Sequence, residues 1–266
     1  MLHIRMISGE VVTSMAVEEL DAVRDLKDRL NQRHGMPPRF RQRLLFHGKS
    51  LDDTTQLDSP MDLDLVLLTF ADVTQSQVDD LTTAAAEGSM DEVESKLQLP
   101  LDPDLPDAHG STALGAAAEG GHIGVMCLLL QAGANKDMAD MRGFTPLMKA
   151  SRGGHVDAAR FLLEVGADKD LPNFRGPFHG MTALMMVSER GYGDVVRLLL
   201  EAGADKDMAD NSGHTALMRA SQNGNVEVVR LLMMAGANKD LANIGGWTAM
   251  LFANKEDHPE IGDLLS

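Results

Sequence analysis

The amino-acid sequence predicts an α+β chain of two domains, in which a small sheet-and-helix domain precedes an all-α solenoid of stacked helix pairs. Three observations predict this class. The first seventy residues alternate strand and helix patterns in the order ββαββ, and from Gly110 onward glycines recur mostly every 33 residues. The chain is 266 residues long and 44% apolar, which is too long for one ordinary core and suits two modest units.

The strands of the first domain are predicted from runs of β-branched and long apolar residues. Residues 2–7 and 10–17 are such runs, and the Ser-Gly pair between them is typical of a β-hairpin. Residues 41–46 and 63–70 predict two further strands, the last of them largely buried, and residues 47–50 predict a turn.

One helix is predicted between these strand pairs. Val23, Leu26 and Leu30 recur at three- and four-residue spacing among charged neighbours, so a single apolar stripe would face the sheet. Gly35 marks its end, because glycine adopts the left-handed cap without steric cost, and the proline at position 37 forbids continuation.

Two sequence motifs in this region resemble ubiquitin. They are Gly35-Met-Pro-Pro after the helix and Arg43-Leu-Leu-Phe-His-Gly-Lys-Ser-Leu-Asp-Asp53 in the strand-turn segment, and the resemblance covers about residues 1–70. It implies a ubiquitin-like β-grasp domain, which we assign to residues 1–72. Because no Gly-Gly terminus follows the last strand, we expect an embedded module that is not conjugated to targets.

The resemblance also implies a receptor-binding patch. Ubiquitin-like domains often engage receptors through an apolar surface, and the matching positions here, Ile7, Leu45 and Val66, are all aliphatic. The alternative is that Leu45 and Val66 are strand residues that only pack on their neighbours.

The remainder of the chain repeats itself. The glycines that open each unit are spaced by 33, 37, 33 and 33 residues, so one unit contains a four-residue insertion; they are Gly110, Gly143, Gly180, Gly213 and Gly246. Each unit reads Gly-x-Thr-Pro/Ala-Leu, a short helix, a turn with glycine, and a second helix that ends before Gly-Ala-Asn/Asp. The threonine hydroxyl is placed to cap the first helix, and Pro146 follows at a tolerated early position.

This pattern resembles the ankyrin repeat, most clearly in Gly143-Phe-Thr-Pro-Leu-Met-Lys-Ala-Ser-Arg-Gly-Gly-His155. The resemblance implies an ankyrin-repeat solenoid, which we assign to residues 74–266. Within it we expect a partial cap, four full repeats and a second partial cap, at residues 74–106, 107–139, 140–172, 173–209, 210–242 and 243–266.

The ankyrin resemblance implies that a protein partner binds on the concave side, which consists of the connecting fingers and the first helices. Four residues directly before the capping threonines are expected to project there: Phe144, Met181, His214 and Trp247. The alternative is that they cover the hairpin beneath them. Exposed turn positions that differ from unit to unit, including Arg152 and Arg190, are expected to set specificity.

The inserted finger at residues 173–180 is the preferred hot spot. It contains Phe174, Arg175 and Phe178, and its glycine and proline residues would stiffen the loop that presents the two aromatic rings. A tolerated neutral insertion is the alternative.

Charge and composition restrict the partners. Residues 1–72 have 9 Lys/Arg against 12 Asp/Glu and residues 73–266 have 15 against 28, which gives net charges of -3 and -13. Such a chain repels phosphate backbones, so we expect protein partners and no nucleic acid. A single cysteine, Cys127, and the absence of a signal peptide or long apolar run favour a cytoplasmic or nuclear protein without membrane contact.

Convergent catalytic residues and metal-ligand clusters do not stand out in this sequence, so we expect a monomeric, non-enzymatic protein that needs no cofactor. Two functions fit. The first is an adaptor or scaffold that binds a client on the repeats and ubiquitin receptors on the N-terminal domain. The second, motivated by the abrupt end at Ser266, is a regulatory or targeting module of a larger enzyme, for example a ubiquitin-pathway ligase or kinase.

Overall fold

The computed structural model describes residues 1–17, 20–176 and 179–266. The expected order of a small α+β domain followed by helix pairs is confirmed. The N-terminal domain has a five-stranded sheet with the spatial order β2-β1-β5-β3-β4, in which β1 and β5 run parallel. Its strands are β1 (Leu2–Met6), β2 (Val11–Met15), β3 (Gln42–Phe46), β4 (Lys49–Ser50) and β5 (Met61–Leu67).

One face of this sheet packs against helix α1 (Val23–His34). Side chains alternate across a strand, and Leu2 and Ile4 of β1 are accordingly fully buried while the residues between and after them are exposed. The apolar stripe of α1, which includes Leu26 and Leu30, covers them. The helix ends at Gly35, whose φ of 63° is the left-handed cap that the sequence predicts.

The strands predicted at residues 2–7, 10–17, 41–46 and 63–70 form with shifted boundaries, as β1, β2, β3 and β5. Arg41 ends a short 3-10 turn, η2 (Arg39–Arg41), instead of opening a strand. The predicted four-residue turn is shorter, because His47 and Gly48 both have positive φ, of 49° and 75°. Such a two-residue turn matches the twist of adjacent strands, so the next two residues pair with β3 as the short strand β4.

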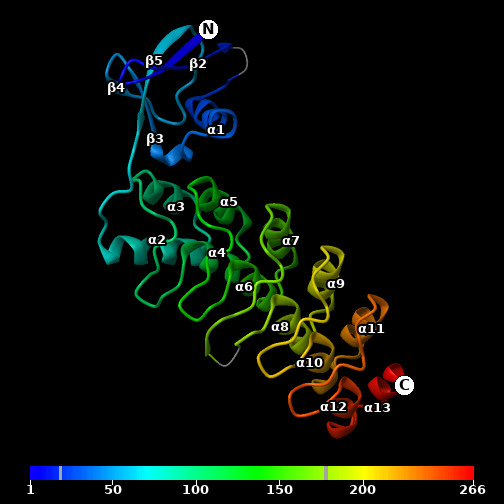
Figure 1. The fold of residues 1–266 in the computed structure, drawn as a ribbon. Helices are drawn as coiled ribbons and strands as arrows, with labels where there is room; N and C mark the ends of the chain where they lie inside the picture. Colours follow the sequence, from blue (N-terminus) through cyan, green and yellow to red (C-terminus); the bar gives the residue numbers. More distant parts are fainter. Residues whose placement is uncertain (18–19, 177–178) are drawn as a thin grey trace.

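Six helix pairs follow in the described part of the chain (Figure 1). Their first helices are α2 (Gln75–Glu87), α4 (Ala113–Gly120), α6 (Pro146–Arg152), α8 (Ala183–Arg190), α10 (Ala216–Gln222) and α12 (Ala249–Lys255). Their second helices are α3 (Met90–Leu97), α5 (Ile123–Gln131), α7 (Val156–Glu164), α9 (Gly193–Glu201), α11 (Val226–Met234) and α13 (Pro259–Leu265). Each row packs helix against helix along the stack. No helix among the described residues has the length and apolarity to cross a bilayer.

The threonine caps form as the sequence predicts. Thr145 accepts a hydrogen bond from the backbone N–H of Met148 at 3.2 Å, and Pro146 occupies the first turn of α6. The same contact begins four other first helices, at Thr112, Thr182, Thr215 and Thr248. Each repeat therefore fixes where its first helix begins.

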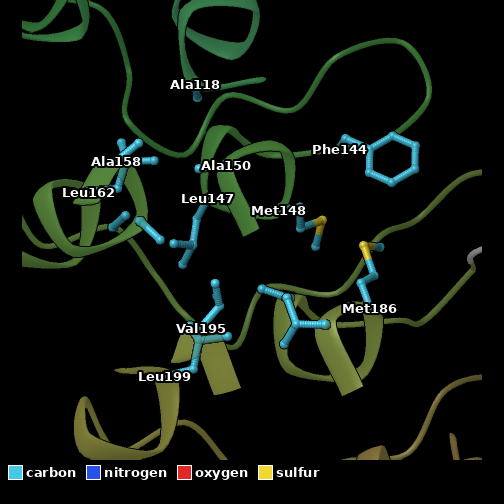
Figure 2. Packing of buried hydrophobic residues seen from close by; sticks show 14 of the residues in the cluster. Ala118, Phe144, Leu147, Met148, Ala150, Ala158, Leu162, Met186, Val195 and Leu199 are labelled. Carbon is cyan, nitrogen blue, oxygen red and sulfur yellow. The ribbon is translucent and has the colours of Figure 1, made fainter. Parts of the chain in front are cut away.

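The core of the solenoid lies between neighbouring helix pairs. Figure 2 shows Leu147 of α6 between Leu162 of α7 and Val195 of α9, all three at most 2% exposed. Met148 is 1% exposed and faces Met186 of the next repeat. Because this layer belongs to two repeats at once, no helix pair buries its apolar face alone.

Polar contacts also join successive repeats. In three of the helix-pair turns a side-chain nitrogen of His122, His155 or Asn225 bonds a carbonyl of the preceding repeat, as His155 does with the Glu119 oxygen at 2.9 Å. In the fingers a carboxylate accepts a backbone N–H of the next finger, as Asp137 does from Asp168 at 2.9 Å. These bonds satisfy backbone groups in segments that have no regular ladder.

The two domains pack on one another (Figure 1). Phe40 of η2 is 7% exposed and belongs to the apolar core of the repeats, not to that of its own domain. The adjacent Pro38 lies against Gly133 at the end of α5, where an added Cβ would be 2.9 Å from the proline Cγ. The N-terminal domain therefore sits on the second helices of the first repeats.

A buried arginine fixes this contact. The Arg39 side chain has no exposed surface, and its guanidinium donates to Asp53 of its own domain at 2.6 Å, to Glu94 of α3 at 3.1 Å and to Gln131 of α5 at 3.3 Å. It also lies over the Phe40 ring, 4.0 Å from the centroid. Charge-assisted bonds to both domains make their relative orientation specific.

Candidate binding surfaces

The outer face of the N-terminal sheet carries the predicted apolar patch. Leu45 pairs with Asp64 and Val66 with Arg43 across β3 and β5, so these side chains share the face away from α1. Leu45 and Val66 are half-buried. Ile7, which follows β1 beside them, is 69% exposed.

This face also carries charge. Arg5 forms a 2.8 Å ion pair with Asp64, next to Leu45, while Arg43 is exposed beside Val66. The hydrogen bond and charge of Asp64 raise the pKa of Arg5 above its usual value. The apolar residues are therefore flanked by one compensated pair and one exposed cation.

Two residues expected on the concave face are buried. Phe144 is 4% exposed and Met181 is 2% exposed, so neither is available to a partner. The N–H of Phe144 donates to the Asp140 carboxylate at 2.9 Å and its carbonyl accepts from the Asp140 N–H, contacts that Trp247 also makes with Asn243. The Phe144 ring lies beneath the guanidinium of Arg152, at 4.9 Å. Here the alternative reading, that these side chains cover the hairpin, holds.

The equivalent residues nearer the C-terminus remain accessible in part. Trp247 is 37% exposed; its ring packs 5.5 Å from that of Phe252, and the Lys255 ammonium lies 5.5 Å from its centroid. His214 also stacks near Phe252, and its Nε2 is 2.9 Å from the side-chain amide of Asn243. Together they form a half-covered aromatic cluster over the last repeats.

The inserted finger is exposed at its described tip residues. Phe174 is 66% exposed and Arg175 is exposed beside it. Asn173 anchors the base of the finger, because it is fully buried and its amide donates to the Arg142 carbonyl at 3.1 Å. Phe178, the second predicted aromatic, lies outside the described residues.

Hollows line the concave side of the stack. One of about 520 Å³ lies between the first helices α2 and α4 and the finger after α3, and one of about 100 Å³ adjoins it. Ser111, Glu119 and Lys149 line both. A third, of about 10 Å³, is lined by Arg152, Met181 and Arg190 among others, so the structure brings these three predicted residues together.

Two cations of this groove, Lys149 and Arg152, are already paired. Lys149 is 5% exposed, and its ammonium contacts Asp140 at 3.0 Å and Glu119 at 3.6 Å. Arg152 contacts Glu119 at 3.2 Å. Arg142, which also lines the smaller hollow, is exposed.

The same arrangement recurs at Asp210. Burial tends to raise the pKa of this carboxyl, but hydrogen bonds from Arg219 and from the backbone N–H groups of His214 and Ser212 outweigh burial and lower the pKa below its usual value. Arg219 also reaches Glu189 of the preceding repeat at 3.5 Å.

The large hollow contains residues that the sequence analysis did not select, chiefly Thr82, Glu87 and Asp107. The sequence does contain a signal that could have identified this hollow. Asp140 and Asp210 are each followed nine residues later by a basic residue, whereas Asp107 is followed at that distance by Ala116.

Fold and surfaces together define a repeat protein with an attached β-grasp domain. The model of ankyrin repeats in three copies matches residues 81–173 and 172–243, and the model of the ubiquitin family matches residues 2–68. The chain belongs to the ankyrin-repeat family and has a ubiquitin-family domain at its N-terminal side. No curated protein matches it closely enough to count as a relative. Ankyrin repeats indicate protein partners, and both modules are of typically non-catalytic kinds.

Proposed function

We propose that the chain is a non-catalytic adaptor, which holds a protein client on the concave side of its repeats and offers its ubiquitin-like domain to ubiquitin receptors. The observation that carries this proposal is the separation of the two surfaces. The N-terminal domain rests on α3 and α5 through Arg39 and Phe40, whereas the groove belongs to the first helices and fingers. Both surfaces are therefore accessible at once.

The client surface begins at the groove and extends over the accessible predicted residues. A partner that reaches from the groove to the C-terminal cap would meet a cationic turn, an extended finger and a half-covered aromatic cluster. Trp, Phe and Arg are typical of such contact centres. The proposed contacts are Arg152, Arg190, Phe174, Arg175, Phe178, His214 and Trp247.

The receptor surface is the patch formed by Ile7, Leu45 and Val66. Exposed apolar groups beside a cation such as Arg43 suit an amphipathic segment with acidic flanks. This surface lies on β3, β5 and the end of β1, away from η2, which contacts the repeats.

The client half of the proposal is tested with the full chain. Crosslinking mass spectrometry in native extract identifies the client, and the variant Phe174→Ala with Phe178→Ala is then compared with the original chain for binding of the purified client. We expect at least about tenfold weaker binding, the effect of one interface hot spot. Met234→Ala is the control, because Met234 is 85% exposed but lies on a second helix. Equal affinity of all three chains would remove the finger from the binding site.

The receptor half has its own test. Ile7→Ala with Leu45→Ala in the full chain should weaken binding to a purified ubiquitin-binding domain by about tenfold or more. Met234→Ala removes an apolar residue that is 85% exposed on α11 of the repeats, far along the chain from the patch, and should change nothing. If no ubiquitin-binding domain binds the original chain, the receptor role is lost and a client scaffold remains.

A further inference from the structure

The repeats contain a recurring charge bridge. Lys149 joins Asp140 of its own finger to Glu119 of the preceding repeat, at 3.0 and 3.6 Å. Arg219 does the same with Asp210 and Glu189. In both cases the cation follows the finger aspartate by nine residues and the glutamate by thirty. The bridge is thus a defined position of the repeat.

The first full repeat retains the acid but lacks the cation. Asp107 is the equivalent of Asp140 and Asp210, and its carboxylate makes the same backbone contacts, with the N–H groups of His109 and Ser111. Nine residues later stands Ala116, and thirty residues before that stands Ala86, next to Glu87. The first repeat therefore has no lysine or arginine at the position of the bridging side chain.

The 520 Å³ hollow occupies this position. Its lining includes Asp107, Ala116, Ala86 and Glu87, the residues that correspond to the bridge and its surroundings. A volume of this size falls in the usual range of ligand pockets, about 300–1,000 Å³. Ala116 stands where a lysine or arginine stem lies in the second and fourth repeats, and Ala86 stands where those repeats have the glutamate of the bridge.

The other two finger positions lack the acid as well as the cation. The third full repeat has Asn173 with Met186, and the C-terminal cap has Asn243 with Phe252. Asn243 accepts the same two backbone N–H bonds, from Gly245 and Trp247, and Asn173 accepts one from Arg175, so a neutral side chain serves the turn. The charge of Asp107 is therefore not needed to shape its finger.

The polar groups of the hollow point to a cationic ligand. Glu87, Asp107 and Glu119 line it against one cation, Lys149, which is shared with Asp140. Neither Asp107 nor Glu87 has a salt-bridge partner in the described ranges 1–17, 20–176 and 179–266. Thr82, 5% exposed, also lines the hollow, and its hydroxyl has no hydrogen-bond partner among those same residues.

We propose that this hollow receives an arginine or lysine side chain from a basic segment of the protein client, which completes in trans the bridge that the second and fourth repeats make internally. This rests on the proposed client-binding function and specifies the chemistry of the client. Hydrogen bonds between a cation and carboxylates are the strong ones. The adjoining hollow of about 100 Å³ gives the segment a path toward α6.

The test uses the full chain and three pentapeptides, acetyl-Ala-Ala-X-Ala-Ala-amide with X as arginine, lysine or citrulline. Citrulline has nearly the shape of arginine without its charge. In ¹⁵N-correlated NMR titrations we expect saturable shifts of the Ser111, Ala116 and Gly120 amides with the two cationic peptides, and at least about tenfold weaker binding of the citrulline peptide. The arginine and lysine arms show which cation fits better.

Two variants of the hollow sharpen the test. Ala116→Lys supplies the missing cation internally, so it should abolish saturable binding and raise the melting temperature. Asp107→Asn keeps the turn, as Asn173 and Asn243 do, and should weaken binding of the arginine peptide by about tenfold. Glu164→Gln, on an exposed site of α7, removes the same charge elsewhere and should leave binding unchanged.

Equal binding of arginine and citrulline peptides, shifts that do not saturate, or unchanged binding by Ala116→Lys would overturn the inference. The client identified by crosslinking separates this failure from that of the proposed function. A client held equally by the original chain and by Ala116→Lys refutes the cation site and retains the adaptor. A client that is released by Ala116→Lys but not by Glu164→Gln supports both.

Discussion

Replacement of Arg39 by alanine should loosen the N-terminal domain from the repeats. The Arg39 guanidinium has no exposed surface, contacts Asp53 within its own domain, and reaches Glu94 and Gln131 in the other. Alanine removes all three contacts and the stacking over Phe40. Since Phe40 remains in the repeat core, we expect a weakened interface and not a missing one.

The expected loss in the free energy of unfolding depends on which ion pairs Asp53 and Glu94 keep in the variant. Removing one member of a buried ion pair typically costs about 3–5 kcal/mol, because it strands the other charge. Asp53 keeps Lys27 at 2.6 Å, and Glu94 is 30% exposed and keeps Arg24. Neither acid is stranded, so the free energy of unfolding should fall by about 3 kcal/mol, the lower end of that range. About half of this, roughly 1.5 kcal/mol for the bonds to the partly exposed Glu94 and to Gln131 together, belongs to the domain contact.

Urea unfolding measures the total, and hydrogen exchange with mass spectrometry locates the loss, because a chain of two domains need not unfold in one step. Peptides of α3 and η2 should exchange about tenfold faster in the variant, which corresponds to the interdomain share. Arg43→Ala removes an exposed arginine only four residues away and should stay within about 0.5 kcal/mol of the original chain. Equal exchange of α3 in both variants would refute the idea that Arg39 joins the domains.

Three further perturbations have defined outcomes. Asp210→Asn should lower the free energy of unfolding by about 1–3 kcal/mol at pH 7. Because the pKa of Asp210 is lowered in the folded chain, the stabilisation by its charge is present above the unfolded-state pKa and is lost as pH falls through the folded-state pKa. The urea midpoints of the variant and the original chain should therefore converge in acid. A constant difference down to low pH would contradict this. Gly133→Ala and Gly166→Ala both place a Cβ on a glycine of positive φ and should each cost about 1–3 kcal/mol in thermal unfolding, but the first also meets Pro38 at 2.9 Å and should be the more damaging. Equal losses would count against the Pro38 contact. Thr145→Ala should lower stability by about 1 kcal/mol in the same assay, as the loss of an N-cap does, and no change would show that the α6 cap is dispensable.

The fold was predictable because its signals are local. Spacing of Leu26 and Leu30 indicates a helix stripe, and Gly35 and Thr145 mark a helix end and a helix start within a few residues of their partners. The domain contact was not predictable in this way. Arg39 meets Gln131 across 92 residues of chain, and nothing in the sequence around either residue indicates the other.

The binding face was predicted in outline and missed in part. Phe144 and Trp247 occupy equivalent positions in their repeats, yet the first is 4% exposed and the second 37%. Further helix pairs follow Phe144, whereas Trp247 belongs to the last helix pair that the structure describes, and the same sequence position has two burials. The repeat pattern predicts the backbone position of a residue, but the packing of neighbouring units determines whether its side chain is exposed.

Internal repetition supplies a control that an ordinary domain lacks. Where Asp140 and Asp210 are bridged by a cation, the pair stabilises the stack, whereas Asp107 with nearby Glu87 adds like charge without compensation. The second and fourth repeats pair the finger aspartate with a cation, whereas the first repeat keeps the aspartate without the cation. The first repeat is therefore less stable at this position than the scaffold allows. Ala116→Lys should therefore separate stability from client binding, because the melting temperature should rise while binding of a cationic client should weaken. If Ala116→Lys gains stability and still binds its client, the missing cation at Ala116 does not serve client binding.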